Sequence, residues 1–189
     1  MVTQATKHKK KQYKALILDV DGTLIPNKRD GMPSKKVKDA IAAALKTSSN
    51  FIEVRMSVVQ VLEETKRKHV SGRVGYVSGI ISSDGDEKIL ENTNRLENYT
   101  NDIRKIQKFP IFSSTDIFSN DLYARLQEIK LPKKEREEKF IVFWREILTS
   151  GHVTDIFMTP RWKESRGAQD EHKTALRLGI RIHYVNIRM

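Results

Sequence analysis

Short apolar runs alternate with helically spaced apolar residues along the second half of the chain. Four runs predict strands, at residues 74–78, 109–112, 155–158 and 180–185. Between and after them, capping residues and apolar faces predict helices, at about 96–106, 119–129, 140–148 and 168–178. The charged stretch 133–139 is typical of a solvated loop or face. Strands that alternate with helices favour a parallel sheet with right-handed crossovers.

The first half is organised differently, and it suggests three segments in all. Residues 1–13 are polar and basic, so we expect a disordered tail. Residues 14–69 predict a buried strand, a helix capped by Ser34 and a connecting helix at 51–68. Residues 70–189 form the α/β domain. The predicted fold class is α/β, a Rossmann-like parallel sheet flanked by helices, with a βα segment in front.

Composition narrows the classes of function. The 189 residues contain no cysteine, which excludes disulfides and thiolate metal sites. No run of about 18 apolar residues is present, so no membrane span is expected. The simplest interpretation is a cytoplasmic protein. The net charge of +11 is concentrated in the tail and suits phosphorylated small molecules, whereas no motif indicates specific nucleic-acid binding.

Chemistry-bearing residues gather near the C-terminus. Asp155 opens a strand, and Ser165 and Gly167 lead into a helix that carries Glu171, which we place in its first turn. Ligands of open parallel sheets bind beyond the carboxyl ends of the strands, and a helix N-terminus attracts anions. Glu171 is therefore expected on the floor of a pocket lined by Gly79, Asp155, Ser165 and Gly167. Structural roles stay open for these residues, since the helix dipole alone favours an early acid and serine is a common cap.

The same stretch carries a family resemblance. Its motif is Trp162-x-x-Ser165-x-Gly167-Ala168-x-x-Glu171-His172-x-x-Ala175-x-x-x-Gly179, and an earlier strand ends in Tyr76-Val-Ser-Gly79. From Val74 to Val185 the chain resembles the nucleoside 2-deoxyribosyltransferase-like superfamily, in particular its DUF4406 branch. The spacing of Asp155, Ser165 and Glu171 is also similar to that of 2'-deoxynucleoside 5'-monophosphate N-glycosidases.

The resemblance implies a site and a reaction. Glu171 would attack the anomeric carbon of a nucleoside or nucleotide, and Asp155 would assist. Tyr76, Gly79, Ser165 and Gly167 would line the ligand site. The implied activity is cleavage or transfer at the N-glycosidic bond, and the implied assembly is a homodimer. A carboxylate below the sugar suits this chemistry, because it can stabilise or trap an oxocarbenium-like state.

A second motif lies near the N-terminus. Leu16-Ile17-Leu18-Asp19-Val20-Asp21-Gly22-Thr23-Leu24 resembles the first motif of haloacid dehalogenase-like (HAD) phosphohydrolases. The resemblance implies that Asp19 accepts the phosphoryl group, that Asp21 is the general acid–base and that Mg2+ bridges nucleophile and phosphate. The later lysine and acidic pair of such a site have no convincing match here. We therefore favour an inactive appendage and no cofactor, with a Mg2+-dependent phosphatase and a non-catalytic nucleotide-binding or interaction module as alternatives.

Overall fold

The computed structural model describes residues 50–118 and 132–186, and its centre is a four-stranded parallel sheet. The strands are β1 (Gly75–Ser78), β2 (Ile111–Ser113), β3 (Asp155–Met158) and β4 (Arg181–Tyr184), in the spatial order β2-β1-β3-β4. The prediction of one parallel sheet with helices around it is confirmed. Strand β2 begins two residues later than predicted. Pro110 has no N–H group to donate, although its carbonyl accepts a 2.9 Å hydrogen bond from the N–H of Gly75.

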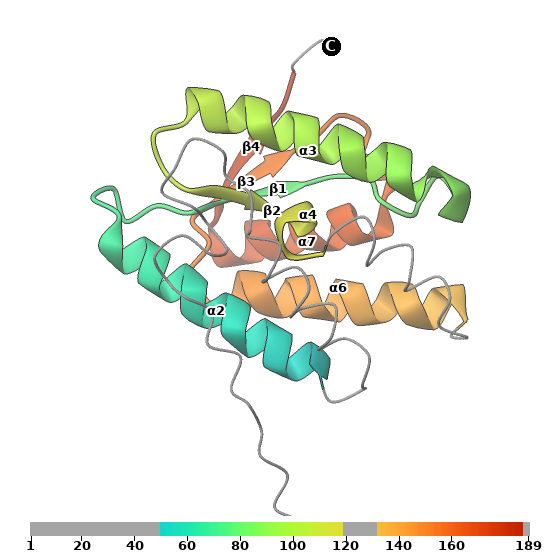
Figure 1. Cartoon of the computed structure of the whole chain (residues 1–189), viewed down its shortest axis with the longest axis horizontal. Coiled ribbons are helices and arrows are strands. Elements are labelled where there is room, and N and C mark those ends of the chain that lie inside the picture. Colours follow the sequence, from blue (N-terminus) through green and yellow to red (C-terminus); the bar gives the residue numbers. More distant parts are fainter. Residues whose placement is uncertain (1–49, 119–131, 187–189) are drawn as a thin grey trace, which may run out of the picture.

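Helices cover both faces of the sheet (Figure 1). The helices are α2 (Asn50–Lys68), α3 (Ile89–Ile106), α4 (Ser114–Ile117), α6 (Lys133–Thr149) and α7 (Arg166–Leu178), with short 3-10 turns at Asp86–Lys88 and Trp162–Glu164. Helix α3 lies on one face, while α6 and α7 lie on the other. Each face is held by its own buried apolar cluster, as expected for a sheet between two helical layers.

Helix α2 packs against α6 as an outer layer. Its apolar residues recur at helical spacing, and Val54, Val58, Val61 and Leu62 are buried in the same cluster as the α6 side chains. The β-branched residues did not prevent a helix, because tertiary burial outweighs a small intrinsic propensity. The segment predicted as a connecting helix is therefore part of the core.

Of the two interpretations of residues 133–139, the solvated face is confirmed and the loop is wrong, because α6 begins at Lys133. Pro132 precedes it with φ −51°, a conformation suited to a helix start. The stretch is rich in Lys, Glu and Arg, which are good helix formers, and Lys139 pairs with Glu135 one turn away. The charged side chains therefore form the solvent-facing surface of the first two turns of a long helix.

Several predictions fall outside the described residues. They are the basic tail, the HAD-like strand with Asp19 and Asp21, the helix capped by Ser34 and the helix at 119–129. Among the described helices, none is long and apolar enough to cross a membrane.

Candidate functional site

The sheet has a topological switch point between β1 and β3. The chain leaves β1 for α3 on one face and leaves β3 for α7 on the opposite face. The loops after these two adjacent strands therefore diverge and leave a crevice at the carboxyl edge, where ligands of open α/β sheets bind. A cavity of about 290 Å³ lies there.

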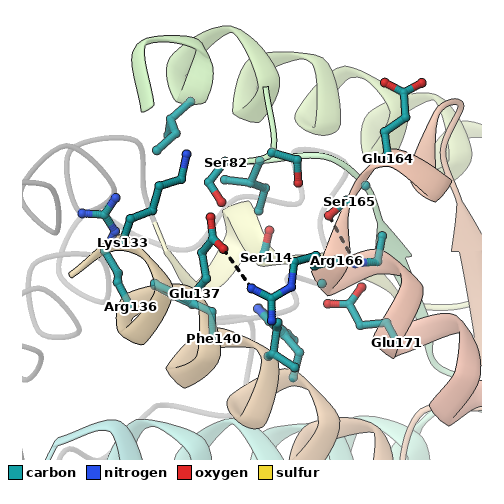
Figure 2. Close-up of a pocket in the computed structure, with 18 of the residues that line it drawn as sticks. Ser82, Ser114, Lys133, Arg136, Glu137, Phe140, Glu164, Ser165, Arg166 and Glu171 are labelled. Atoms are coloured by element: carbon teal, nitrogen blue, oxygen red, sulfur yellow. Dashed lines mark hydrogen bonds and ion pairs between the residues drawn. The ribbon is translucent and has the colours of Figure 1, made fainter. Parts of the chain in front are cut away.

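Figure 2 shows the cavity between α6, α7 and the loop after β1. The residues that line it come from the ends of β1 and β2, the first turns of α6 and the N-terminus of α7. They include all but one of the residues predicted to form the site, namely Tyr76, Gly79, Ser165, Gly167 and Glu171. The sequence thus indicated the crevice and the part of its wall that comes from the end of β1 and the start of α7.

Glu171 is the buried carboxylate of the cavity, with 6% of the residue exposed. The hydroxyl of Tyr76 donates a 3.1 Å hydrogen bond to its Oε1 atom, and the hydroxyl of Ser78 donates to its Oε2 atom. Burial raises the pKa of Glu171 to about 7, although both hydrogen bonds act to lower it. The carboxyl group therefore changes charge near neutral pH.

Strand alternation explains why two donors reach one carboxylate. Tyr76 and Ser78 are two residues apart on β1, so their side chains point to the same face of the sheet, the face that α7 covers. The ring of Tyr76 stacks on Trp144 of α6, with centroids 4.9 Å apart and planes at 21°. This stacking fixes the direction in which the Tyr76 hydroxyl points.

The placement of Glu171 in the first turn of its helix is wrong. Helix α7 begins at Arg166, so Glu171 is its sixth residue and lies in the second turn. The stabilising effect of a helix N-terminus on acids fades within the first turn. The position of Glu171 is therefore explained by its two hydroxyl partners and the cavity rather than by the helix dipole.

Ser165 caps α7 as the sequence suggested. Its hydroxyl accepts a 3.3 Å hydrogen bond from the N–H of Ala168, and the side chain is buried. Gly167 follows in the first turn, and a Cβ atom there would meet only the Ser165 hydroxyl, at 3.8 Å. This helix end lines the cavity with little side-chain bulk, which suits a negatively charged group.

Three cations surround the cavity. Arg166 lies 3.4 Å from Glu137 of α6, and a dashed line joins the two side chains in Figure 2. Lys133 and Arg136 approach Asp86 instead, at 3.8 and 2.7 Å. Each cation lines the cavity while touching an acid. These three cations can therefore bind an anionic ligand if they give up their present carboxylate partners.

Asp155 does not belong to this cavity, so its predicted place beside Glu171 is wrong. It opens β3, at the amino end of the strand, whereas the cavity lies at the carboxyl end. Asp155 is fully buried and accepts hydrogen bonds from Arg73, Arg181 and His183. Burial alone would raise the pKa of Asp155, but the hydrogen bonds, above all from Arg73, hold it well below its usual range. Its role in this structure is to tie the starts of three strands together.

Several cavity residues had escaped sequence reasoning. Ser78, which holds Glu171 without lining the cavity itself, had a signal, because it is two residues after Tyr76 on a predicted strand. Glu137 and Arg136 lie in the stretch predicted as a solvated loop or face, and Ser114 belongs to no motif. Within residues 50–118 and 132–186, no group of three His, Asp or Glu side chains is placed to hold a metal ion. Asp19 and Asp21 lie outside these ranges.

Comparison with known proteins identifies no relative of this chain. No protein-family model, no curated protein and no solved structure matches the chain. The fold and the cavity define a Rossmann-like α/β domain with a buried carboxylate at its switch point, and the function must be argued from these residues.

Proposed function

We propose that the cavity binds a nucleoside or its 5'-monophosphate and that Glu171 acts on the N-glycosidic bond. The observation that carries this proposal is the buried Glu171 carboxylate, held by two hydroxyl donors beneath a cavity at the switch point of the sheet. Such a group is constrained in direction and largely removed from water. Both conditions suit a carboxylate that attacks a bound sugar, because a fixed direction of approach lowers the entropic part of the barrier.

The reaction is nucleophilic displacement. A carboxylate oxygen of Glu171 forms a bond to the anomeric carbon as the bond to the base breaks, and the base leaves with the electron pair and takes a proton from a neighbouring acid. Water or a second base then attacks the anomeric carbon and returns a proton to that acid as the bond to Glu171 breaks. The Tyr76 and Ser78 hydroxyls orient the carboxylate in both steps, since each oxygen keeps a further lone pair. Only ionised Glu171 can attack, so base release should increase as pH rises through about 7.

A second carboxylate is available on the opposite wall. Glu137 lines the cavity from α6 with a side chain that is 21% exposed, whereas Glu164 is 53% exposed and is turned outward in Figure 2. Because Asp155 is excluded by its position, we assign the hydrogen bond to the leaving base to Glu137. Arg166, the ion-pair partner of Glu137, also lies 3.5 Å from Glu138, and it can face a phosphate at the start of α7 by exchanging these exposed contacts.

A substrate screen tests the proposal. Nucleosides and 5'-nucleotides are incubated with the full chain, and released base and released phosphate are measured separately. We expect base release that Glu171→Gln abolishes and that Glu91→Gln, an exposed acid outside the cavity, leaves unchanged. Base release that persists in Glu171→Gln would remove the mechanism.

Other outcomes of the same screen point to the alternatives. Release of phosphate that depends on Mg2+ and is lost in Asp19→Asn would move the activity to the N-terminal motif. Nucleotide binding without any released product would leave a non-catalytic binding module.

A further inference from the structure

Ser114 is a buried hydroxyl without a partner in the cavity wall. The residue is 1% exposed, and its Oγ atom has no hydrogen-bond partner among the residues that the structure describes. It stands directly after β2, the strand next to β1 at the carboxyl edge. In Figure 2 it is drawn between Ser82 and Arg166, which also line the cavity.

The neighbours of Ser114 at the start of α4 all use their polar groups, so an unpartnered hydroxyl is unusual there. Ser113 and Thr115 share a 2.8 Å hydrogen bond between their hydroxyls, and Asp116 accepts from the backbone N–H of Ser113. In this polar segment, Ser114 is therefore the residue whose side chain makes no hydrogen bond to its neighbours. Buried polar side chains nearly always find a partner, so an unused one in a cavity wall indicates a ligand atom.

The arrangement of the cavity identifies which part of the ligand this is. Under the proposed function the sugar lies over Glu171 and a phosphate lies at Ser165 and Gly167, all on the α7 side. The rest of the cavity wall combines apolar side chains, among them Ile89 and Phe140, with polar ones, including Ser82, Ser83, Ser114, Lys133, Arg136 and Glu137. A flat ring with a polar edge, such as a nucleobase, suits this mixed wall, because its faces can pack on the apolar side chains while its edge hydrogen-bonds to the polar ones.

We propose that Ser114 reads the base of the bound nucleoside or nucleotide by hydrogen bonding to its edge, an inference that rests on the proposed function. A serine hydroxyl both donates and accepts, and it reaches three staggered positions by rotation about one bond. The Oγ atom is covered in the free protein, so this rotation brings it to the ligand. Ser114 is thus a specificity-determining residue, and Glu171 remains the reacting group.

Two measurements separate a ligand-reading hydroxyl from a structural one. Removing a hydroxyl that has no partner leaves no donor or acceptor unpaired, so Ser114→Ala should melt no lower than the parent protein in the absence of ligand. Thr100→Val is the matched control, because the Thr100 hydroxyl is equally buried but donates a 2.7 Å hydrogen bond to the Leu96 carbonyl, away from the cavity. This control should melt lower and bind ligands normally.

Binding is measured with the four 2'-deoxynucleoside 5'-monophosphates and with 2-deoxyribose 5-phosphate, which lacks a base. Every protein carries Glu171→Gln so that no base is released during the measurement. Ser114→Ala should weaken binding of at least one nucleotide about tenfold, the loss of one hydrogen bond to a buried ligand atom. Binding of 2-deoxyribose 5-phosphate should not change.

The inference is overturned by an equal loss for every ligand including 2-deoxyribose 5-phosphate, by no loss for any nucleotide, or by a lower melting temperature of unliganded Ser114→Ala. Binding of none of the probes to the parent would overturn both proposals. The two proposals can also be separated. If Ser114→Ala weakens nucleotide binding in a base-dependent way, but the protein with Glu171 intact releases no base, this inference holds and the glycosidic function fails.

Discussion

Tyr76 and Glu171 are 95 residues apart in the chain and are joined by a 3.1 Å hydrogen bond at the floor of the cavity. The tyrosine hydroxyl stabilises the ionised carboxylate, and its ring is fixed by Trp144. The bond thus connects the first strand of the sheet to the helix that carries the proposed nucleophile. Its consequences can be measured as a change in the pKa of Glu171.

Tyr76→Phe keeps the ring and removes the donor. The pKa of Glu171 should then move further above 7, because burial is opposed by one hydrogen bond fewer. The increase of base release with pH should shift upward by roughly one pH unit, since a hydrogen bond to a charged group is worth about 1.5–3 kcal/mol and one unit about 1.4 kcal/mol. Tyr99→Phe, in the other apolar cluster, serves as control. An unshifted pH profile would show that the bond does not tune Glu171.

Glu171 also links stability to pH. Its folded pKa of about 7 is above the ordinary value of 4.5, so the folded state binds the proton more tightly than the unfolded chain. Its contribution to stability is complete below pH 4.5 and is lost as pH rises to about 7, by up to about 3 kcal/mol. Glu171→Gln mimics the protonated form and should remove this slope. Urea unfolding of both proteins at pH 5 and pH 8 measures it, and equal slopes would contradict the raised pKa.

Glu137 is expected to act on the leaving base. Glu137→Gln should slow the release of an unmodified base by about 10²-fold or more, the usual contribution of a general acid or base. A 7-methylated purine nucleoside already carries a positive base that leaves without protonation, so its cleavage should be nearly unaffected. The ratio of the two rates, measured for each variant, is the test. An equal loss for both substrates would assign Glu137 to binding or folding instead.

Some parts of the fold and of the site could be predicted from the sequence because they depend on local patterns of residues. The four strands were predictable because buried parallel strands are continuous apolar runs, and their carboxyl ends indicated where the cavity lies. Glu171 and Ser165 lie in one local motif, so their spacing on a helix could be used directly.

Asp155 was misplaced because the family resemblance put it beside Glu171, although a residue that opens a parallel strand lies at the amino end, away from the carboxyl edge where ligands bind. Its partners Arg73, Arg181 and His183 come from before β1 and from β4, so only the folded sheet brings them together. Ser114 and Glu137 escaped for the same reason. Their importance arises from a cavity formed by three separate segments.

Gly79 and Gly167 should respond differently to alanine. A Cβ atom at Gly79 would collide with the Oγ1 atom of Thr159, which is held by a 3.0 Å hydrogen bond to the Ser78 carbonyl. Gly79→Ala should therefore cost about 1–3 kcal/mol of stability. Gly167 is in the first turn of α7 with open space around it, so Gly167→Ala should be neutral or stabilise by up to about 1 kcal/mol. Chemical denaturation of the two variants measures the contrast, and equal effects would refute it.

Asp155 provides the last prediction, since its removal should damage the fold and spare the chemistry. Asp155→Asn keeps the shape of the side chain but leaves Arg73 and Arg181 beside a buried neutral group. We expect a loss of about 3 kcal/mol in the free energy of unfolding, typical of breaking a buried ion pair from one side. The low pKa of Asp155 means that its stabilisation is present above pH 3.8, the ordinary value, and is lost as pH falls below it. The stabilities of the parent protein and the variant should therefore converge in acid.

The control for Asp155→Asn is Asp102→Asn, from an exposed pair with Lys105, which should change stability by less than about 1 kcal/mol. At a temperature where Asp155→Asn is folded, its rate of base release should equal that of the parent protein. A stable Asp155→Asn variant that has lost base release would restore Asp155 to the catalytic site and contradict its position at the amino end of β3.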